Sequence, residues 1–356
     1  MVFTNAGAQT LNICDGPYIS YNKDQVTVRS VGSDSKAVME TFPLSDISKH
    51  PLTIHFSNHA NWDFDITIRK QIETEPSEYS HIETIFAVSD IEGQFEVLRN
   101  LLIANQVMDS MYQWTFGKNH LVICGDLFDR GRDVTALLWL LYKLEYEAEA
   151  VGGFVHIILG NHDIMNLAGN FKYADQKYAD NARLMRVSNS DLYTKNTELG
   201  RWLLSKNIIE KIEGNLCLHA GISSQILSKK MDVEAINKTC RPYYALSKNP
   251  EYLGNQGLVD FFSRNGPFWY RGYFVKPRED QSTVDQTLSF YHCDRIIVGH
   301  TISGKNIRSY YQDKVIGIDV DAHTGSAEAI LIVHDKVYTT DETGELKPVT
   351  AGMLNP

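Results

Sequence analysis

Cysteine is scarce in this sequence. The 356 residues include five cysteines, and no two of them form a C-x-x-C pair. An odd number of cysteines without regular spacing argues against a disulfide framework. Cys124 and Cys217 lie inside apolar runs, where a small buried thiol packed in the core is the simplest interpretation.

An excess of basic charge and a long apolar run are also missing. The chain has 34 Lys and Arg against 44 Asp and Glu, which gives a formal net charge of −10. This balance argues against a broad basic groove for nucleic acid, although bound metal ions can still attract an anionic substrate by reversing the local field. No apolar stretch is long enough to span a bilayer. We expect neither a nucleic acid nor a membrane as partner, and the sequence leaves the oligomeric state open.

The N-terminal segment MVFTNAGAQ lacks the basic and apolar regions of a signal peptide, which indicates a cytoplasmic protein as the chain stands. The small residues Ala6, Gly7 and Ala8 before Gln9 nevertheless resemble the end of a cleavage site. Export to the periplasm or beyond, with the leader removed, therefore remains an open alternative.

The chain changes character near residue 80. Residues 11–72 hold short β-leaning runs separated by turn residues, and TEPSEYS (residues 74–80) has the composition of a linker. We predict a small β-rich N-terminal module with its linker over residues 1–80. From Ile82 onward apolar runs alternate with amphipathic segments, which is typical of α/β folds. We assign residues 81–340 to an α/β domain and residues 341–356 to a C-terminal tail.

Apolar runs predict the buried strands of this domain: TIFAVSD, HLVICGD, FVHIILGNHD, LCLHAG, RIIVGHT, VIGIDV and AILIV. A first helix follows from the spacing of Phe95, Leu98 and Leu102, and a second from VTALLWLLYKLEYEAEA. Two helical excursions, about residues 164–210 and 225–292, should form the walls or lids of a substrate site.

The first five of these runs end in residues that can bind metal ions. Asp, Asn and His are hard or borderline donors, suited to Mn, Mg, Fe or Zn. In open α/β sheets the carboxyl edge of the strands is where ligands bind. The sequence therefore predicts one metal site formed by Asp90, Asp126, Asn161, His219 and His300.

The motifs SDIEGQ, GDLFDRG, GNHD, LHAG and VGHT occur in this order and resemble successive blocks of the calcineurin-like metallophosphoesterase superfamily. GDLFDRG and the later GPFWYRG resemble its phosphoprotein-phosphatase branch, near the Shewanella-like phosphatases. The resemblance covers about residues 82–335. It implies a β-sandwich flanked by helices, with a dinuclear metal centre at one end.

The resemblance also implies the ligands of two divalent metal ions, which we expect to be manganese, with iron, zinc or magnesium as alternatives. Asp126 would bridge the ions, Asp90 and Glu92 would complete one site, and Asn161, His219 and His300 would complete the other. A hydroxide between the ions would attack phosphorus in line.

One position departs from the pattern, because the family usually has histidine where this chain has Glu92. If Glu92 is a ligand, its oxygen donor and its charge favour a harder ion such as Mn²⁺ or Mg²⁺. If it is not, the first metal site is weak or empty. A milder departure is Asp163, where protein phosphatases commonly have glutamate.

Four further residues resemble the catalytic groups of the family. His162 is the candidate general acid, and Asp129 would orient it and favour its charged form. Arg130 and Arg271 would hold phosphate oxygens, although the aromatic surroundings of Arg271 also suit a packing or cation–π role. Asp319, Asp321 and His323 follow another strand. They suit either a supporting role beside the metal ligands or a solvated loop.

These observations predict a metal-dependent phosphomonoester hydrolase, most simply a protein phosphatase acting on phosphoserine, phosphothreonine or phosphotyrosine. Hydrolysis of a small molecule, such as a dinucleoside polyphosphate, is the alternative reaction. The alternative from another class is a non-catalytic scaffold of phosphoesterase fold, and Glu92 is its single support.

Overall fold

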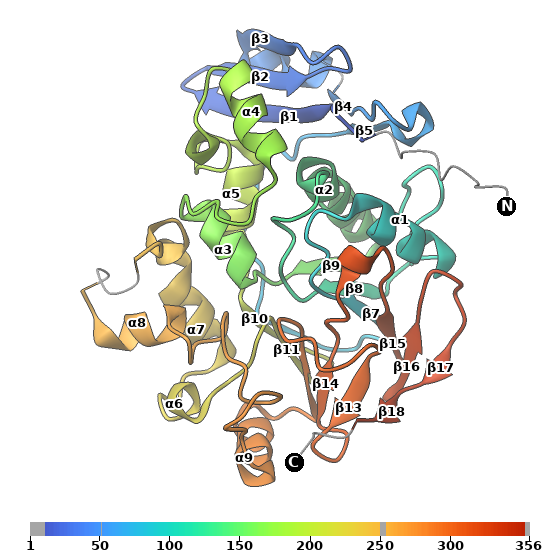
Figure 1. Cartoon of the computed structure of the whole chain (residues 1–356), viewed down its shortest axis with the longest axis vertical. Coiled ribbons are helices and arrows are strands. Elements are labelled where there is room, and N and C mark those ends of the chain that lie inside the picture. Colours follow the sequence, from blue (N-terminus) through green and yellow to red (C-terminus); the bar gives the residue numbers. More distant parts are fainter. Residues whose placement is uncertain (1–10, 51, 250–253, 353–356) are drawn as a thin grey trace, which may run out of the picture.

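The computed structural model describes residues 11–50, 52–249 and 254–352 (Figure 1). Residues 6–9, which suggested a cleavage site, lie outside the described residues. None of the described helices is long and apolar enough to cross a lipid bilayer.

Two mixed sheets form the centre of the protein (Figure 1). The first has six strands in the order β17-β16-β15-β7-β8-β9, and its central strands β7, β8 and β9 run parallel. In chain order its strands are β7 (Thr84–Val88), β8 (His120–Ile123), β9 (Phe154–Ile157), β15 (Ala329–Val333), β16 (Lys336–Thr340) and β17 (Lys347–Pro348).

The second sheet has seven strands in the order β18-β13-β14-β12-β11-β10-β6, and β11, β12 and β14 run parallel. Its strands are β6 (Glu78–Tyr79), β10 (Ile209–Ile212), β11 (Asn215–Leu218), β12 (Arg295–Val298), β13 (Arg308–Tyr310), β14 (Val315–Gly317) and β18 (Thr350–Ala351). Each of the seven predicted apolar runs contains a strand.

Apolar side chains from both sheets form a common core between them. Ile85 and Ala87 of β7 belong to this cluster together with Ile297 of β12 and Ile316 of β14. The intervening residues of β7, Phe86 and Val88, belong to the larger cluster that includes the helices. The central strands such as β7 are therefore buried on both faces, which explains why the sequence shows continuous apolar runs rather than alternation.

Helices cover the outer faces. Helices α1 and α2 lie beside the six-stranded sheet, whereas α6, α7 and α8 lie together on the other side of the molecule (Figure 1). The helices are α1 (Phe95–Ala104), α2 (Val134–Val151), α3 (Asn161–Leu167), α4 (Gln176–Leu184), α5 (Glu198–Ser205), α6 (Ser224–Leu227), α7 (Val233–Cys240), α8 (Gln256–Phe262) and α9 (Gln281–Tyr291). The predicted α/β fold, a β-sandwich flanked by helices, is confirmed.

The N-terminal residues form two small antiparallel sheets, as the β-leaning runs predict. One has the order β1-β2-β3 and the other pairs β4 with β5. Their strands are β1 (Asp15–Asn22), β2 (Gln25–Val31), β3 (Ala37–Pro43), β4 (Leu52–Ile54) and β5 (Phe64–Ile66). Strand β1 packs against α2 and α5, so this part of the chain rests on helices of the α/β domain.

A buried ionic cluster ties the segment after this module to the helices. Lys206, at the end of α5, is 1% exposed and lies between Glu75 of the linker and Glu145 of α2, with its Nζ 2.6 Å from Glu145. Arg69 binds the other oxygen of Glu145 at 3.0 Å. Burial opposes the charge on Lys206, but the carboxylates of Glu145 and Glu75 outweigh it and raise the pKa of Lys206.

Replacing Lys206 with Met would leave Glu75 and Glu145 buried without their shared cation. We expect the free energy of unfolding, measured by urea titration, to fall by about 3–5 kcal/mol. The control Lys49→Met removes a lysine whose partner Asp46 lies on the surface, and it should hardly move the unfolding midpoint. Equal stability of Lys206→Met and the parent chain would contradict the structural role of the cluster.

Candidate metal centre

The predicted metal ligands follow the carboxyl ends of strands from both sheets. Strands β7, β8 and β9 lead into Asp90, Asp126 and Asn161, and β11 and β12 lead into His219 and His300. Because the central strands of each sheet run parallel, these ends meet at one edge of the sandwich.

Backbone hydrogen bonds join the loops after β7 and β8. The Asp90 N–H donates to the carbonyl of Gly125 at 3.0 Å, and the Glu92 N–H donates to the carbonyl of Asp126 at 2.9 Å. The Gly131 N–H donates back to the carbonyl of Glu92 at 2.9 Å. The motifs SDIEGQ and GDLFDRG are thus held as one unit, which fixes the relative positions of their side chains.

Several site residues have left-handed backbone conformations that residues other than glycine rarely adopt. Such strain persists where the surrounding structure enforces it. The residues and their φ values are Asp90 (52°), Glu92 (44°), Asp126 (56°), Asp129 (76°), Arg130 (54°) and His300 (63°).

Glycines let these loops approach each other. A Cβ at Gly160 would lie 2.2 Å from Oδ1 of Asp126, and a Cβ at Gly299 would lie 2.2 Å from Oδ2 of Asp90. Both distances are far below van der Waals contact. The glycines that precede Asn161 and His300 are therefore required for the carboxylates to reach the site.

The site residues surround one cavity of about 420 Å³. Asp129 and His219 lie behind its wall, since they are 1% and 0% exposed and bind His162 and Asp126 respectively. The other predicted site residues line the cavity directly: Asp90, Glu92, Asp126, Arg130, Asn161, His162, Arg271 and His300.

Four potential ligands converge at one end of the cavity. Nε2 of His219 lies 2.9 Å from Oδ1 of Asn161, 3.2 Å from Nδ1 of His300 and 3.2 Å from Oδ2 of Asp126. Ligand atoms around an ion with bonds of about 2.1 Å are separated by roughly 3.0 to 3.4 Å in octahedral or tetrahedral geometry. The spacing and the donor types fit a divalent cation.

The tautomer of His219 agrees with this assignment. Its Nδ1 lies 2.9 Å from the carbonyl of Cys124, and a carbonyl can only accept, so Nδ1 carries a proton. Nε2 is then the nitrogen that is available to a cation. Burial, followed by the nearby His219 and Arg271, lowers the pKa of His300 to about 2 and leaves its ring neutral.

A second set of potential ligand atoms comes from Glu92, Asp126 and His162. Oε1 of Glu92 lies 3.6 Å from Nε2 of His162, and its Oε2 contacts Arg130 and His323. Asp90 is not among these three residues; its carboxylate oxygens accept the backbone N–H of His300, at 3.0 and 3.2 Å, and still have lone pairs for a cation. It still lines the same cavity.

The charges in the cavity require compensation. Burial and the neighbouring Asp319 raise the pKa of Asp90 well above its usual value, and burial raises the pKa of Asp319 to about 6. Burial opposes a charge on His219, but Asp126 and Asp90 raise its pKa to about 10. Divalent cations would stabilise these carboxylates far better than a single protonated imidazole, so the residues present fit a metal centre.

His162 forms a separate pair with Asp129. Its Nδ1 lies 2.6 Å from Oδ2 of Asp129, whose Oδ1 accepts a hydrogen bond from Nδ2 of Asn166 at 2.7 Å. Burial disfavours the imidazolium, but the bond to Asp129 and the charges of Asp126 and Glu92 outweigh it and raise the pKa of His162. The ring is therefore protonated more readily than a free imidazole, and its Nε2 is turned to Glu92 and Asp126.

The two arginines approach the cavity from different loops. Arg130 follows β8, and its guanidinium contacts Glu92 and His323. The guanidinium of Arg271 donates to the carbonyl of His300 at 2.9 Å and to the hydroxyl of Thr301 at 3.3 Å. Both side chains line the cavity, so both can meet an anion inside it.

Sequence reasoning assigned no definite role to several residues that the structure brings to the cavity. Asp319, Asp321 and His323, whose role the sequence left open, line it after β14. Tyr173 also lines it, 5.2 Å from the His162 ring, and its carbonyl accepts the Arg130 N–H at 2.9 Å. The acids and histidine at the end of GIDVDAH were a usable signal. Tyr173 gave none, because it lies in a helical excursion and belongs to no motif.

Asp163 has a clear structural role that the sequence did not reveal. It is fully buried, and its carboxylate accepts the backbone N–H groups of Gly160 at 2.7 Å, Leu127 at 2.8 Å and Asp126 at 3.0 Å. These bonds join the loops that carry Asp126 and Asn161.

Comparisons with known proteins agree with this geometry. Residues 83–304 match the sequence profile of the calcineurin-like phosphoesterases. An uncharacterized protein of Schizosaccharomyces pombe, C1840.07c, is 30% identical over 246 residues, which are 66% of this chain and 72% of that protein. Shewanella-like protein phosphatase 2 of Arabidopsis thaliana is 24% identical over 307 residues, which are 73% of this chain and 76% of that protein.

A solved structure extends the similarity to nearly the whole chain. The crystal structure of a cold-active protein-tyrosine phosphatase from a psychrophilic Shewanella species is 30% identical and superposes with a TM-score of 0.85. The superposition covers 94% of this chain and 99% of that protein. The likeness therefore includes the N-terminal sheets as well as the sandwich.

Asp163→Ala would leave buried backbone N–H groups without an acceptor and would release Asp126. We expect the free energy of unfolding to fall by about 2–4 kcal/mol and Mn²⁺ affinity, measured by titration calorimetry, to fall with it. The control Asp285→Ala removes an exposed carboxylate that pairs with Lys314 on the surface, and it should change neither quantity measurably. Unchanged Mn²⁺ binding by Asp163→Ala would show that Asp163 does not position the ligands.

Proposed function

The chain belongs to the calcineurin-like phosphoesterase family, and on that premise we propose that it is a metal-dependent phosphomonoester hydrolase acting on phosphorylated protein. One observation carries the proposal. A cluster of candidate cation ligands and the hydrogen-bonded His162–Asp129 pair lie together at one cavity that two arginines also line. A metal-dependent phosphomonoesterase uses these groups together: a place for cations, a proton for the leaving group and positive charge for the phosphate.

We assign one divalent cation to Asn161, His219, His300 and Asp126, and a second to Asp126, Asp90 and Glu92. Calcineurin-like phosphoesterases use a dinuclear metal centre. Bound there, two cations would supply a water molecule of lowered pKa and would neutralise phosphate charge. The carboxylate of Asp126 suits the shared position because it has two oxygens, and Glu92 adds a hard oxygen donor that favours Mn²⁺ or Mg²⁺.

His162 is assigned the role of general acid. Asp129 accepts the Nδ1 proton and keeps the ring in one orientation, so that the second proton sits on Nε2, facing the cavity. From there it can move to the oxygen of the departing alcohol or phenol. Asn166 holds the other oxygen of Asp129, which keeps the carboxylate from turning away.

Arg130 and Arg271 are assigned to the phosphate. A guanidinium group can bind two phosphate oxygens at once, and the two arginines lie on different loops. Arg130 forms an ion pair with Glu92, and Arg271 donates a hydrogen bond to the carbonyl of His300. These contacts hold both guanidinium groups at the wall of the cavity.

Aromatic side chains at the cavity rim favour a protein substrate, and phosphotyrosine in particular. Tyr173 is 41% exposed beside His162, and Trp269 lies edge-on to His300 with ring centroids 6.0 Å apart. A phenyl leaving group can pack between such rings. The likeness to a protein-tyrosine phosphatase over 94% of the chain supports the same choice.

The proposal predicts how two variants respond to an aryl phosphate with Mn²⁺ present. His162→Asn removes the proton donor, so kcat should fall by about 10²–10⁴-fold. Asp129→Asn withdraws the charge that stabilises the imidazolium. The pKa of His162 then falls, and the alkaline limb of the kcat profile should move to lower pH. His55→Asn, at an exposed histidine of the N-terminal module, serves as the control and should retain full activity.

Full activity of His162→Asn, or an Asp129→Asn profile that matches the parent chain, would refute the general-acid assignment. A chain that binds Mn²⁺ but hydrolyses neither aryl phosphates nor phosphopeptides would support the scaffold alternative. A panel of phosphopeptides, mononucleotides and dinucleoside polyphosphates distinguishes the protein substrate from the small-molecule alternative, and we expect phosphopeptides to have the highest kcat/KM.

A further inference from the structure

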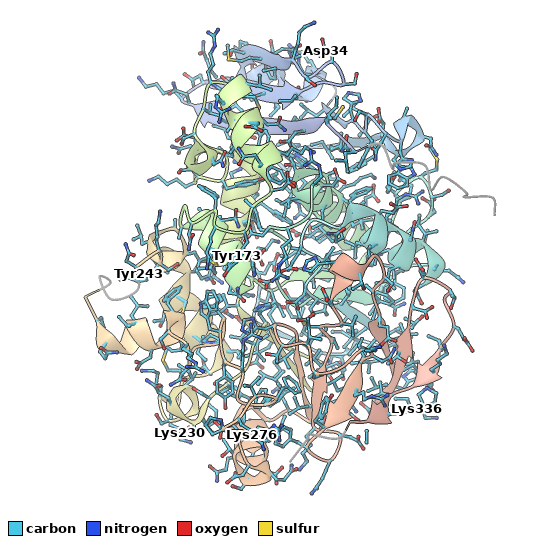
Figure 2. All side chains as sticks on the ribbon, in the orientation of Figure 1. Asp34, Tyr173, Lys230, Tyr243, Lys276 and Lys336 are labelled. Atoms are coloured by element: carbon cyan, nitrogen blue, oxygen red, sulfur yellow. The ribbon has the colours of Figure 1, made fainter. Side chains whose placement is uncertain are left out.

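A groove of about 580 Å³ continues from the cavity onto the surface. Tyr173, Trp269 and Arg271 line both the groove and the cavity, so the two spaces share a wall. In Figure 2, Tyr173 lies near the centre of the molecule, and Tyr243 lies to its left. An occupant of the groove would therefore be attached to, or lie directly beside, the group bound in the cavity.

The groove is basic in a chain that is acidic overall. Lys172, Lys248, Arg264 and Arg271 line it, whereas no Asp or Glu occurs among its described lining residues. None of these four cations forms an ion pair within residues 11–50, 52–249 and 254–352. Their charge is thus free to meet an anionic ligand, although the net charge of the whole chain is −10.

Neutral groups hold two of these cations in place. Nζ of Lys248 donates to the carbonyl of Gly169 at 3.0 Å, and Nζ of Lys172 donates to the hydroxyl of Tyr173 at 2.9 Å. Such partners orient an ammonium group without neutralising it, so its remaining protons stay available.

The floor of the groove is apolar. Ile164 and Met165 of α3 and Phe262 of α8 line it together with Trp269. An apolar floor with a basic rim fits a polypeptide segment that carries carboxylates next to aliphatic or aromatic side chains. A free phosphate or a single acidic amino acid would leave the floor uncovered.

The opposite flank of the cavity has the opposite charge. Asp321 lines both the cavity and a second depression, where it is accompanied by Glu328, Asp341 and Glu342 and by one cation, Lys305. An acidic segment that left the cavity in this direction would meet carboxylates. The two flanks therefore give an extended substrate one favourable orientation.

We propose that the groove formed by Lys172, Lys248, Arg264, Arg271 and their apolar floor binds an acidic polypeptide segment next to the phosphorylated residue. The inference rests on the proposed function and specifies its substrate class: phosphoproteins with acidic residues on one side of the phosphoresidue. The groove supplies affinity and orientation, while the chemistry stays in the cavity.

The test uses phosphotyrosine peptides of one length with three acidic residues before the phosphoresidue, three after it, or none. We expect one of the two acidic peptides to have a lower KM than the neutral peptide. In the variant Lys248→Gln/Arg264→Gln the KM of that peptide should rise by about tenfold at low salt, with kcat unchanged. The neutral peptide and an aryl phosphate should keep their KM values, and 0.5 M NaCl should abolish the preference.

The matched control is Lys305→Gln/Lys336→Gln, which removes the same charge away from the groove. Lys305 lies in the depression on the opposite flank, and Lys336 begins β16 at the far side of the molecule (Figure 2). This control should leave the preference for the acidic peptide intact. If it reduced the preference equally, overall charge rather than the groove would be responsible, and the inference would fail.

Equal KM values of the parent chain for acidic and neutral peptides would also overturn the inference. The same holds if the groove variant changed the KM for a dinucleoside polyphosphate but not the KM for any peptide. These outcomes leave the proposed function standing, because hydrolysis of the neutral peptide and the aryl phosphate tests it separately. If the parent chain hydrolysed no phosphomonoester, the proposed function itself would be rejected.

Discussion

The mutual repulsion of buried carboxylates is the constraint on which the site depends. Asp90, Asp126 and Asp319 lie in or beside one cavity with Glu92, and each is at most 6% exposed. Placing such charges together in a buried region is unfavourable unless cations compensate them. The fold nevertheless fixes them there through backbone bonds between loops, left-handed conformations and glycines without which the loops would clash. The fold thus holds these carboxylates in fixed positions.

The arrangement of the strands and loops explains how the fold holds these carboxylates together. Parallel strands from two different sheets end at the same edge, so each candidate ligand is anchored by a strand that is buried on both faces. Asp163 uses its own carboxylate to bind backbone N–H groups rather than a cation, and so joins the loops after β8 and β9. The helical excursions then place Tyr173, Trp269 and the basic groove beside the cavity.

Much of the fold and of the candidate site was predictable from the sequence, because two local patterns in the sequence indicate them. A continuous apolar run indicates a strand buried on both faces, and a polar residue at its end indicates the ligand edge. Strands such as β6, β13 and β18, of two or three residues, have no such signal, since pairing with neighbours rather than burial of a long run stabilises them. The division of the strands between two sheets is likewise a long-range property, and β15 pairs with β7 across more than two hundred residues.

Prediction of the candidate site from the sequence has the same limit, because contacts between distant segments are not visible in it. Asp90, Asp126, Asn161, His219 and His300 are recognisable because each follows a predicted strand. The roles of Asp163 and Tyr173 depend on which loops pack together, and no spacing in the sequence encodes that. His323 lies more than two hundred residues from Glu92, and it reaches Glu92 from the segment after β14, a strand that pairs with β12, whose end carries His300.

Anomalous diffraction at the manganese edge from crystals grown with Mn²⁺ would show whether the cavity holds two metal ions. We expect two peaks roughly 3.5–4 Å apart in the cavity, with Asp126 between them. One peak should lie beside Asn161, His219 and His300, and the other beside Asp90 and Glu92. A cavity without anomalous density, or a single peak with Glu92 still turned to Arg130 and His323, would contradict a centre that holds two metal ions.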